Sequence, residues 1–212
     1  TGGGYVRKVL GVPYGIGDRI VEVQKYFREV YDFKALFTDG RQFDVLLGDQ
    51  EVLRAGDLVL RAIRTPGHTP GCVSYLVGDA LFTGDALFLP NFGTPRCDFP
   101  MGSVEDLWDS IMKLFELPDE TRVFPGHDYV EPYQFQSTIG EQKKSNPHVR
   151  EGISREEFIK IRKEKDSTLK APQLLHFSVQ VNINGGQLPI EVADNGRSYF
   201  KLPMNLSPKL KN

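Results

Sequence analysis

The sequence has 212 residues, of which 40% are hydrophobic and 25% are charged, so it is long and apolar enough to build a full hydrophobic core. Its 26 basic and 28 acidic residues give a net charge of −2, which excludes the strongly basic surface that binding to nucleic acid or to an anionic membrane requires. No apolar run approaches the roughly 20 residues of a membrane span, and two Cys are too few for a disulfide framework, which indicates a reducing compartment.

The first half of the chain predicts two helices followed by short strands. Residues 5–10 favour a helix, and residues 18–31 favour a longer one because their apolar side chains recur at helical spacing. Residues 32–50 carry turn signals and predict a loop. Turn residues at 55–57 predict a hairpin over 51–64, and two apolar runs predict strands over 72–77 and 80–83.

The second half predicts more helices than strands. A strong amphipathic helix is expected over 103–117, a strand over 122–124, and helices over 137–145 and 154–165. The charge run from Arg155 to Asp166 indicates a solvated amphipathic helix. Alternating side chains predict a strand over 177–183, and a loop-rich tail follows. Strands interleaved with helices indicate an α/β layered domain.

Three short apolar strands each end in a Gly that is followed at once by a His or an Asp. The side chains in question are His68, Asp85 and His127. Gly allows backbone geometries that other residues avoid, so the next side chain can turn away from the strand end. Two imidazoles and a carboxylate placed in this way are reasonable ligands for a first-row metal ion. The alternative is that the three segments are ordinary turns.

The segments around these residues resemble the metal-site motifs of the metallo-β-lactamase superfamily. They read TPGHTPG at 65–71, TGDALF at 83–88 and PGHDY at 125–129. Within that superfamily they are most similar to the persulfide dioxygenases, which are relatives of glyoxalase II. The loop GTPRCDF at 93–99 resembles a loop of that branch, and the resemblance continues through the helices at 137–147 and 156–158 and the segment 180–183.

This resemblance implies an αββα sandwich spanning residues 1–212, with the metal at one edge. It implies one Fe(II) per chain held by two His and one Asp, of which His68 and Asp85 are two. Zn or a mixed dinuclear centre is the alternative. His127 would then bind a second metal ion, whereas in a mononuclear site it would be an outer hydrogen-bonding residue. Both roles stay open for His127.

The resemblance also implies the substrates, glutathione persulfide and O2. It implies that Arg96 binds the glutathione moiety, that Asp98 orients Arg96, and that the hydroxyl of Tyr129 points toward the substrate. A plain surface ion pair between Arg96 and Asp98, or a packed aromatic ring at Tyr129, is the alternative. A homodimer, a rhodanese-type partner that supplies sulfur, and a cytoplasmic or mitochondrial-matrix location are further expectations.

One departure from the family pattern concerns the start of the chain. The superfamily motif Thr-His-x-His-x-Asp-His is not found in the sequence, and TGGGY at 1–5 resembles the segment that follows that motif. We therefore expect a sandwich without its N-terminal strands, with the third iron ligand preceding Thr1. The alternative functions are a dinuclear thioester hydrolase of the glyoxalase II type and a non-catalytic domain.

Four other side chains are further candidates for functional residues. Cys72 is expected to be a buried, inert thiol. Cys97 lies between Arg96 and Asp98, so it is either a second inert thiol or a reactive one whose pKa Arg96 lowers. His148 and His176 lack partners at ligand spacing and are expected to be surface or core histidines.

Overall fold

A computed structural model describes residues 2–128, 131–189 and 195–204. Its contacts divide the chain into two compact units, one made of residues Thr1–Leu47 and Lys170–Asn212 and the other of residues Gly48–Leu169. Each unit is described separately below. In the part of the chain that the structure covers, none of the helices has the length and apolar character needed to cross a lipid bilayer.

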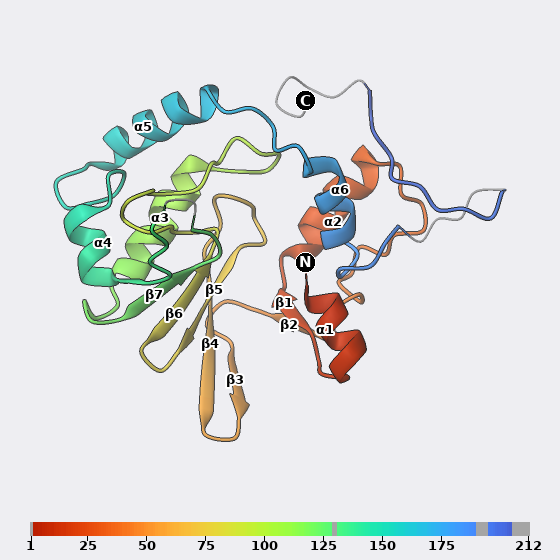
Figure 1. Ribbon diagram of the computed structural model, residues 1–212, viewed down its shortest axis with the longest axis horizontal. Coiled ribbons are helices and arrows are strands. Elements are labelled where there is room, and N and C mark those ends of the chain that lie inside the picture. The colour runs from red at the N-terminus through yellow and green to blue at the C-terminus, as the bar shows by residue number, and fades with distance from the viewer. Residues whose placement is uncertain (1, 129–130, 190–194, 205–212) are drawn as a thin grey trace. The chain divides into compact units, whose positions relative to one another are not determined.

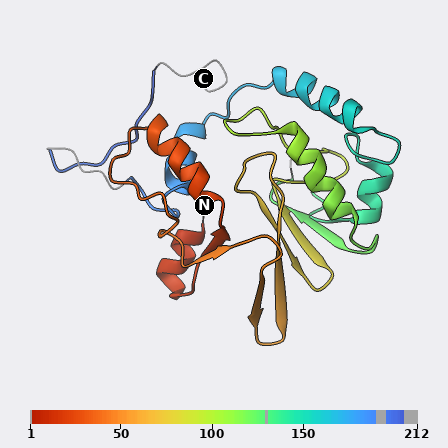
Figure 2. The ribbon, with the colours of Figure 1, turned by 180° about the vertical axis from the view of Figure 1, so that it is seen from behind.

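The larger unit, residues 48–169, is built on a mixed sheet of six strands. In spatial and sequence order these are β3 (Val52–Ala55), β4 (Leu58–Arg64), β5 (Val73–Val77), β6 (Ala80–Gly84), β7 (Arg122–Pro125) and β8 (Ser137–Thr138). Neighbouring strands are antiparallel except β6 and β7, which are parallel. The β3–β4 hairpin extends beyond the other strands in both face views of the sheet (Figures 1 and 2).

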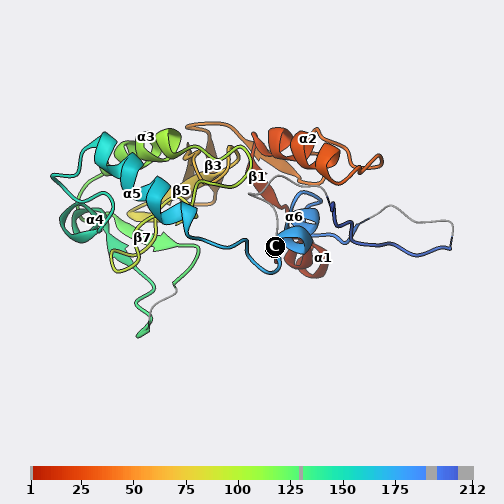
Figure 3. The ribbon, with the colours of Figure 1, turned by 90° about the horizontal axis from the view of Figure 1, so that it is seen from above.

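Three helices pack on this sheet: α3 (Val104–Phe115), α4 (Ile139–Ser145) and α5 (Arg155–Ser167). Figure 3 shows α5 beside α3, and the ring of Trp108 on α3 packs against that of Phe158 on α5. The core between helices and sheet is apolar, and its fully buried members are Leu81, Leu87, Leu107, Ile111, Leu114, Val123, Ile139 and Phe158. A parallel pair such as β6 and β7 needs a crossover connection, and α3 supplies it.

Helices α3 and α5 begin within one residue of their predicted starts, whereas α4 begins at residue 139 and not at the predicted residue 137, because residues 137–138 form the strand β8. Ser103 accepts a hydrogen bond from the backbone N–H of Asp106 at the start of α3. Ser154 and Glu157 form a complete capping box at the start of α5. These contacts satisfy backbone N–H groups that the first turn of a helix leaves without a partner.

The smaller unit contains α1 (Gly3–Leu10), α2 (Ile20–Val30), α6 (Leu175–Asn182) and a parallel pair of short strands, β1 (Gly15–Gly17) and β2 (Val45–Leu47). Its core is a cluster of aromatic and aliphatic side chains: Phe27, Tyr31, Phe33, Leu36 and Ile183. His176 is buried here, and its Nδ1 lies 2.9 Å from the hydroxyl of Tyr31, so it is a core histidine as expected.

The strand predicted over 177–183 is wrong, because residues 177–182 lie in α6 and Ile183 is the residue that caps its C-terminal end. Its apolar residues alternate, which favours a strand, but the buried side chains are His176, Gln180 and Ile183, spaced at helical intervals. Gln180 is buried because its amide donates to the backbone carbonyls of His176 and Lys201. A prediction from hydrophobic periodicity counts only apolar residues as buried, so it does not detect buried polar residues at helical spacing. The pair β1 and β2 also includes three residues of the predicted loop 32–50.

Candidate metal centre

The three predicted ligands follow strands that run in the same direction. Strands β4 and β6 both pair antiparallel with β5, and β6 pairs parallel with β7. The carboxyl ends of β4, β6 and β7 therefore meet at one edge of the sheet. His68 lies four residues after the end of β4, Asp85 directly follows β6, and His127 lies two residues after β7. The topology thus confirms that the three strand ends lie together.

His68 is held in one orientation. Its Nδ1 lies 2.7 Å from the carbonyl oxygen of Arg96, and its ring packs against the ring of Phe99 with centroids 5.2 Å apart. A carbonyl oxygen can only accept a hydrogen bond, so Nδ1 carries the proton and Nε2 keeps its lone pair in the neutral ring. This is the tautomer that metal-binding histidines adopt when they donate their other N–H to a carbonyl.

Asp85 lies between the two imidazoles. Its Oδ2 is 3.8 Å from Nε2 of His68, and its Oδ1 is 3.4 Å from Nε2 of His127. The two histidines differ in exposure, since the side chain of His68 is 16% exposed and that of His127 is 50% exposed. His127 also stacks edge-on against Phe88, with centroids 6.3 Å apart. The structure therefore brings the two imidazoles together on either side of the Asp85 carboxylate.

Two glycines make this arrangement possible. Gly67 has φ +141°, and a Cβ placed on it would come within 2.7 Å of the backbone nitrogen of Leu107 in α3. Only Gly allows the loop before His68 to pass so close to a helix. At Gly126 a Cβ would lie 3.3 Å from Oδ1 of Asp85, so a larger residue would crowd the carboxylate.

The residues fit a metal ion, although they form a partial ligand set. Oδ1 of Asp85 is buried and accepts no hydrogen bond from the described residues, which is costly for a carboxylate oxygen without a cation. The lone pair of His68 Nε2 faces the same carboxylate. Among the residues that the structure describes, however, no three His, Cys, Asp or Glu side chains are arranged closely enough to hold a metal ion by themselves.

Arg96 and Asp98 form an ion pair beside this centre. Nε and Nη2 of Arg96 lie 2.6 and 2.7 Å from the two carboxylate oxygens of Asp98, and the guanidinium sits over the ring of Phe99. Both side chains are largely buried, so this is not the plain surface ion pair of the alternative interpretation. Tyr129, the remaining predicted substrate contact, lies outside the described residues.

The two thiols are poor nucleophiles. Burial, with a further contribution from the nearby Asp166 carboxylate, raises the pKa of Cys97 well above its usual range. Burial also raises the pKa of Cys72, whose sulfur lies 3.1 Å from the hydroxyl of Thr69. A raised pKa favours the protonated thiol at neutral pH, which agrees with the inert interpretation of each, although Cys72 is partly exposed and not fully buried as expected.

Sequence reasoning missed two contributors to the site. Phe99 was noted only as part of the loop motif, yet its ring lies against both His68 and Arg96. Arg162 and Asp166 were assigned to a solvated helix face, yet their side chains are 2% and 5% exposed and contact the loop that carries Arg96. The only available signal was their spacing of four residues within a helix.

The family follows from the match of residues 2–127, more than half of the chain, to the metallo-beta-lactamase superfamily. The chain belongs to the metallo-β-lactamase superfamily. This agrees with the fold predicted from the sequence, in which an α/β layered domain places its ligands at strand ends.

Two relatives within the superfamily carry the names of different activities. The chain is 50% identical over 195 residues to glyoxylase B2 of Dictyostelium discoideum, a match that covers 90% of this chain and 66% of that protein. It is 37% identical over 151 residues to the mitochondrial persulfide dioxygenase ETHE1 of Homo sapiens, covering 69% of this chain and 56% of that protein. The chain thus spans about two thirds or less of the length of these relatives.

The crystal structure of ETHE1 from Myxococcus xanthus is similar in fold. It superposes with a TM-score of 0.71 at 34% sequence identity, covering 88% of this chain and 72% of that chain. The superposition therefore extends across most of the chain.

Proposed function

We propose that the protein is a glutathione-dependent persulfide dioxygenase with one Fe(II) per chain. Glutathione persulfide and O2 react to give glutathione and sulfite. The sulfur–sulfur bond breaks, O2 accepts the electrons that the outer sulfur loses, and water supplies the remaining oxygen and the protons. The similarity to two proteins named ETHE1, one of them a solved structure, supports this choice within the superfamily.

The observation that carries the proposal is that the two histidines differ in burial and in how firmly hydrogen bonds hold them. His68 is mostly buried and bonded through Nδ1 to a backbone carbonyl, whereas half of the His127 side chain is exposed. This supports one firmly held metal position, with His68 and Asp85 as ligands and His127 as an outer residue that contacts Asp85. His68 and Asp85 would supply one imidazole and one carboxylate, and the family resemblance implies a second histidine ligand besides them; such a set on one face leaves positions open on an Fe(II) ion.

In this proposal the chain's own residues bind and orient the substrate. Arg96 would bind a carboxylate of the glutathione moiety, since a guanidinium presents a planar set of donors that suits a carboxylate. Asp98 and Phe99 hold the guanidinium in place from its edge and its face. The bound iron would supply the redox chemistry with O2. Correct placement of the persulfide sulfur lowers the barrier by removing the need to bring the reactants together.

A second candidate is a thioester hydrolase of the glyoxalase II type. Asp85 directs one oxygen toward each imidazole, which also suits a carboxylate that bridges two metal ions. The name of the glyoxylase B2 relative favours the same activity. In this case His127 would be a ligand, and two metal ions would activate a water molecule for attack on the thioester. A non-catalytic domain is the third candidate.

Metal content and substrate preference together test the proposal. We expect about one iron per chain in protein purified without oxygen, O2 consumption with glutathione persulfide, and no thiol release from lactoylglutathione. Replacing His68 or Asp85 by Ala should remove the iron, whereas His127→Ala should retain it with reduced activity.

Three results would contradict this assignment. Two metal equivalents in the wild type that fall to one in His127→Ala, together with thiol release from lactoylglutathione, would establish the hydrolase. No bound metal and no turnover of either substrate would establish the non-catalytic domain. Retention of iron by both His68→Ala and Asp85→Ala would show that the metal lies elsewhere.

A further inference from the structure

We propose that the buried ion pair of Arg162 and Asp166 on α5 is a positioning device that fixes the tautomer and orientation of His68. Neither side chain contacts His68. They act through the backbone of residues 94–97, whose Arg96 carbonyl accepts the hydrogen bond from Nδ1 of His68. The inference rests on the metal-binding role of His68 proposed above.

The ion pair is closely spaced and buried. Nη2 and Nε of Arg162 lie 2.6 and 3.1 Å from Oδ1 of Asp166, one helical turn further along α5. Arg162 is among the largest fully buried side chains of the molecule, at 1% exposure. A charged pair so deeply buried adds little stability compared with apolar side chains of similar volume. Its presence therefore favours a role other than packing.

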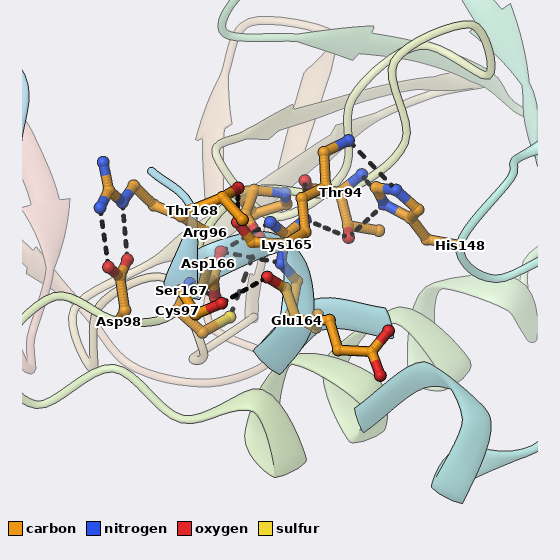
Figure 4. Close-up of polar contacts among 12 residues, drawn as sticks. Thr94, Arg96, Cys97, Asp98, His148, Glu164, Lys165, Asp166, Ser167 and Thr168 are labelled. Atoms are coloured by element: carbon orange, nitrogen blue, oxygen red, sulfur yellow. Dashed lines mark hydrogen bonds and ion pairs between the residues drawn. The ribbon is translucent and has the colours of Figure 1, made fainter. Parts of the chain in front are cut away.

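The pair holds the backbone on both sides of Arg96. Nη1 of Arg162 donates a 2.8 Å hydrogen bond to the carbonyl oxygen of Thr94, two residues before Arg96. Oδ2 of Asp166 accepts a 2.9 Å hydrogen bond from the backbone N–H of Cys97, the residue after it. Figure 4 shows Asp166 reaching Cys97 from α5, with Thr94 and Asp98 on either side of that contact.

His148 adds a third anchor to the same loop. Its Nδ1 accepts a 3.0 Å hydrogen bond from the backbone N–H of Thr94 and lies 2.9 Å from the Thr94 hydroxyl (Figure 4). The loop is therefore fixed at Thr94 and Cys97 by buried groups, while the Arg96 side chain pairs with Asp98. This leaves the Arg96 carbonyl in a defined position under Nδ1 of His68.

The consequence for His68 is chemical as well as geometric. If the loop relaxes, the carbonyl moves away from Nδ1, and the neutral ring is no longer confined to the tautomer whose Nε2 is unprotonated. Groups that orient a metal-binding histidine in this way commonly change metal affinity by ten- to a hundredfold. The pair thus acts on the metal through the Arg96 carbonyl and the His68 ring.

The test is the double variant Arg162→Met/Asp166→Leu in the 212-residue chain. It removes both charges together, so no uncompensated charge is left buried, and the apolar replacements keep much of the packing. The first measurement is the 15N chemical shifts of the His68 ring in the metal-free chain at pH 8.5, where an ordinary imidazole is neutral. The chain has four histidines, and His68→Gln assigns the signals.

We expect wild-type Nδ1 to show the shift of a protonated ring nitrogen and the double variant to show an averaged shift. The second measurement is the dissociation constant for Fe(II) without oxygen and for Zn(II), which should rise about tenfold or more in the double variant. Phe158→Leu is the matched control, because Phe158 is buried on the same helix but contacts the core around α3. It should lower thermal stability without changing either the His68 shift or the metal affinity.

Two outcomes overturn the inference. One is an unchanged His68 tautomer with metal dissociation constants within twofold of wild type in the double variant. The other is an equal change in Phe158→Leu, which would show a general effect of weakened packing. A wild-type chain that binds no metal would contradict the proposed function, but the His68 shifts of the metal-free chain would still decide the positioning role.

Discussion

Gly67 shows how a single missing Cβ shapes the site. In Gly67→Ala the new methyl group would meet the backbone of Leu107, and the residue would have to keep a φ that side chains rarely adopt. We expect a loss of about 3 kcal/mol or more in the free energy of unfolding. Chemical denaturation measures it.

Gly78→Ala is the matched control for this prediction. Gly78 also has a positive φ, but nothing lies within 4 Å of an added Cβ. Its cost should be only about 1 kcal/mol, because the backbone penalty remains and the steric clash does not. Equal losses in the two variants would contradict the close approach of the Gly67 loop to α3.

His148 gives the molecule a stability that depends on pH. Burial, and then the nearby charges of Lys165 and Arg162, lower the pKa of His148 from 6.5 to about 4. Between pH 6.5 and 4 the unfolded chain therefore binds a proton at this residue that the folded chain does not. The free energy of unfolding is highest above pH 6.5 on this account, and falls by up to about 3 kcal/mol as the pH drops to 4.

His148→Asn isolates this contribution. The Asn carbonyl offers Thr94 an acceptor in place of Nδ1 but does not titrate. Urea denaturation of wild type and variant at pH 7 and pH 4 should show a smaller loss in the variant. The other titrating groups are common to both proteins and cancel in the comparison. The same loss in both would show that His148 does not cause the pH dependence.

At the scale of elements, α5 depends on its first turn. Ser154 accepts a 3.2 Å hydrogen bond from the N–H of Glu157, and the Glu157 carboxylate accepts one from the N–H of Ser154. Ser154→Ala should lower the free energy of unfolding by about 1 kcal/mol. The helix carries the pair that anchors the 94–97 loop, so its stability also matters to the site.

Ser167→Ala is the control on the same helix. The Ser167 hydroxyl donates to the carbonyl of Glu164 near the C-terminal end and caps no free N–H group. Its removal should change the free energy of unfolding by less than about 0.5 kcal/mol. A thermal or urea titration of both variants compares them directly, and a larger loss in Ser167→Ala would contradict the assigned cap.

At the scale of the whole molecule, burial is distributed very unevenly among the helices. No residue of α1 is buried, whereas α3 buries Val104, Leu107, Ser110, Ile111 and Leu114. Backbone amides of α1 should therefore exchange with solvent through local opening, while those of α3 exchange only when the larger unit unfolds. Hydrogen exchange followed by mass spectrometry should show α1 exchanging at least about a hundredfold faster. Comparable protection in both helices would contradict this description.

The amino-acid sequence alone predicts the α/β class, most of the strands, and the starts of helices α3 and α5 in the larger unit. These features depend on contacts between near neighbours, such as the Ser154–Glu157 capping box and the hydrophobic spacing of α3, which a linear pattern records. The sequence also makes His68, Asp85 and His127 candidate metal ligands, because each follows a Gly at the end of a strand. Their convergence needed the sheet, since only the strand directions place the three ends at one edge.

Whether a polar side chain on a helix is buried or exposed follows only from the tertiary structure. The sequence predicts a strand where α6 lies because a hydrophobic pattern does not count the buried polar side chains of His176 and Gln180. These side chains are buried because they have hydrogen-bond partners far along the chain. Arg162 and Asp166 carry charges that a pattern assigns to solvent, yet they are buried because the loop at 94–97 provides their hydrogen-bond partners. Burial of a polar group depends on distant partners, and a linear pattern contains no information about them.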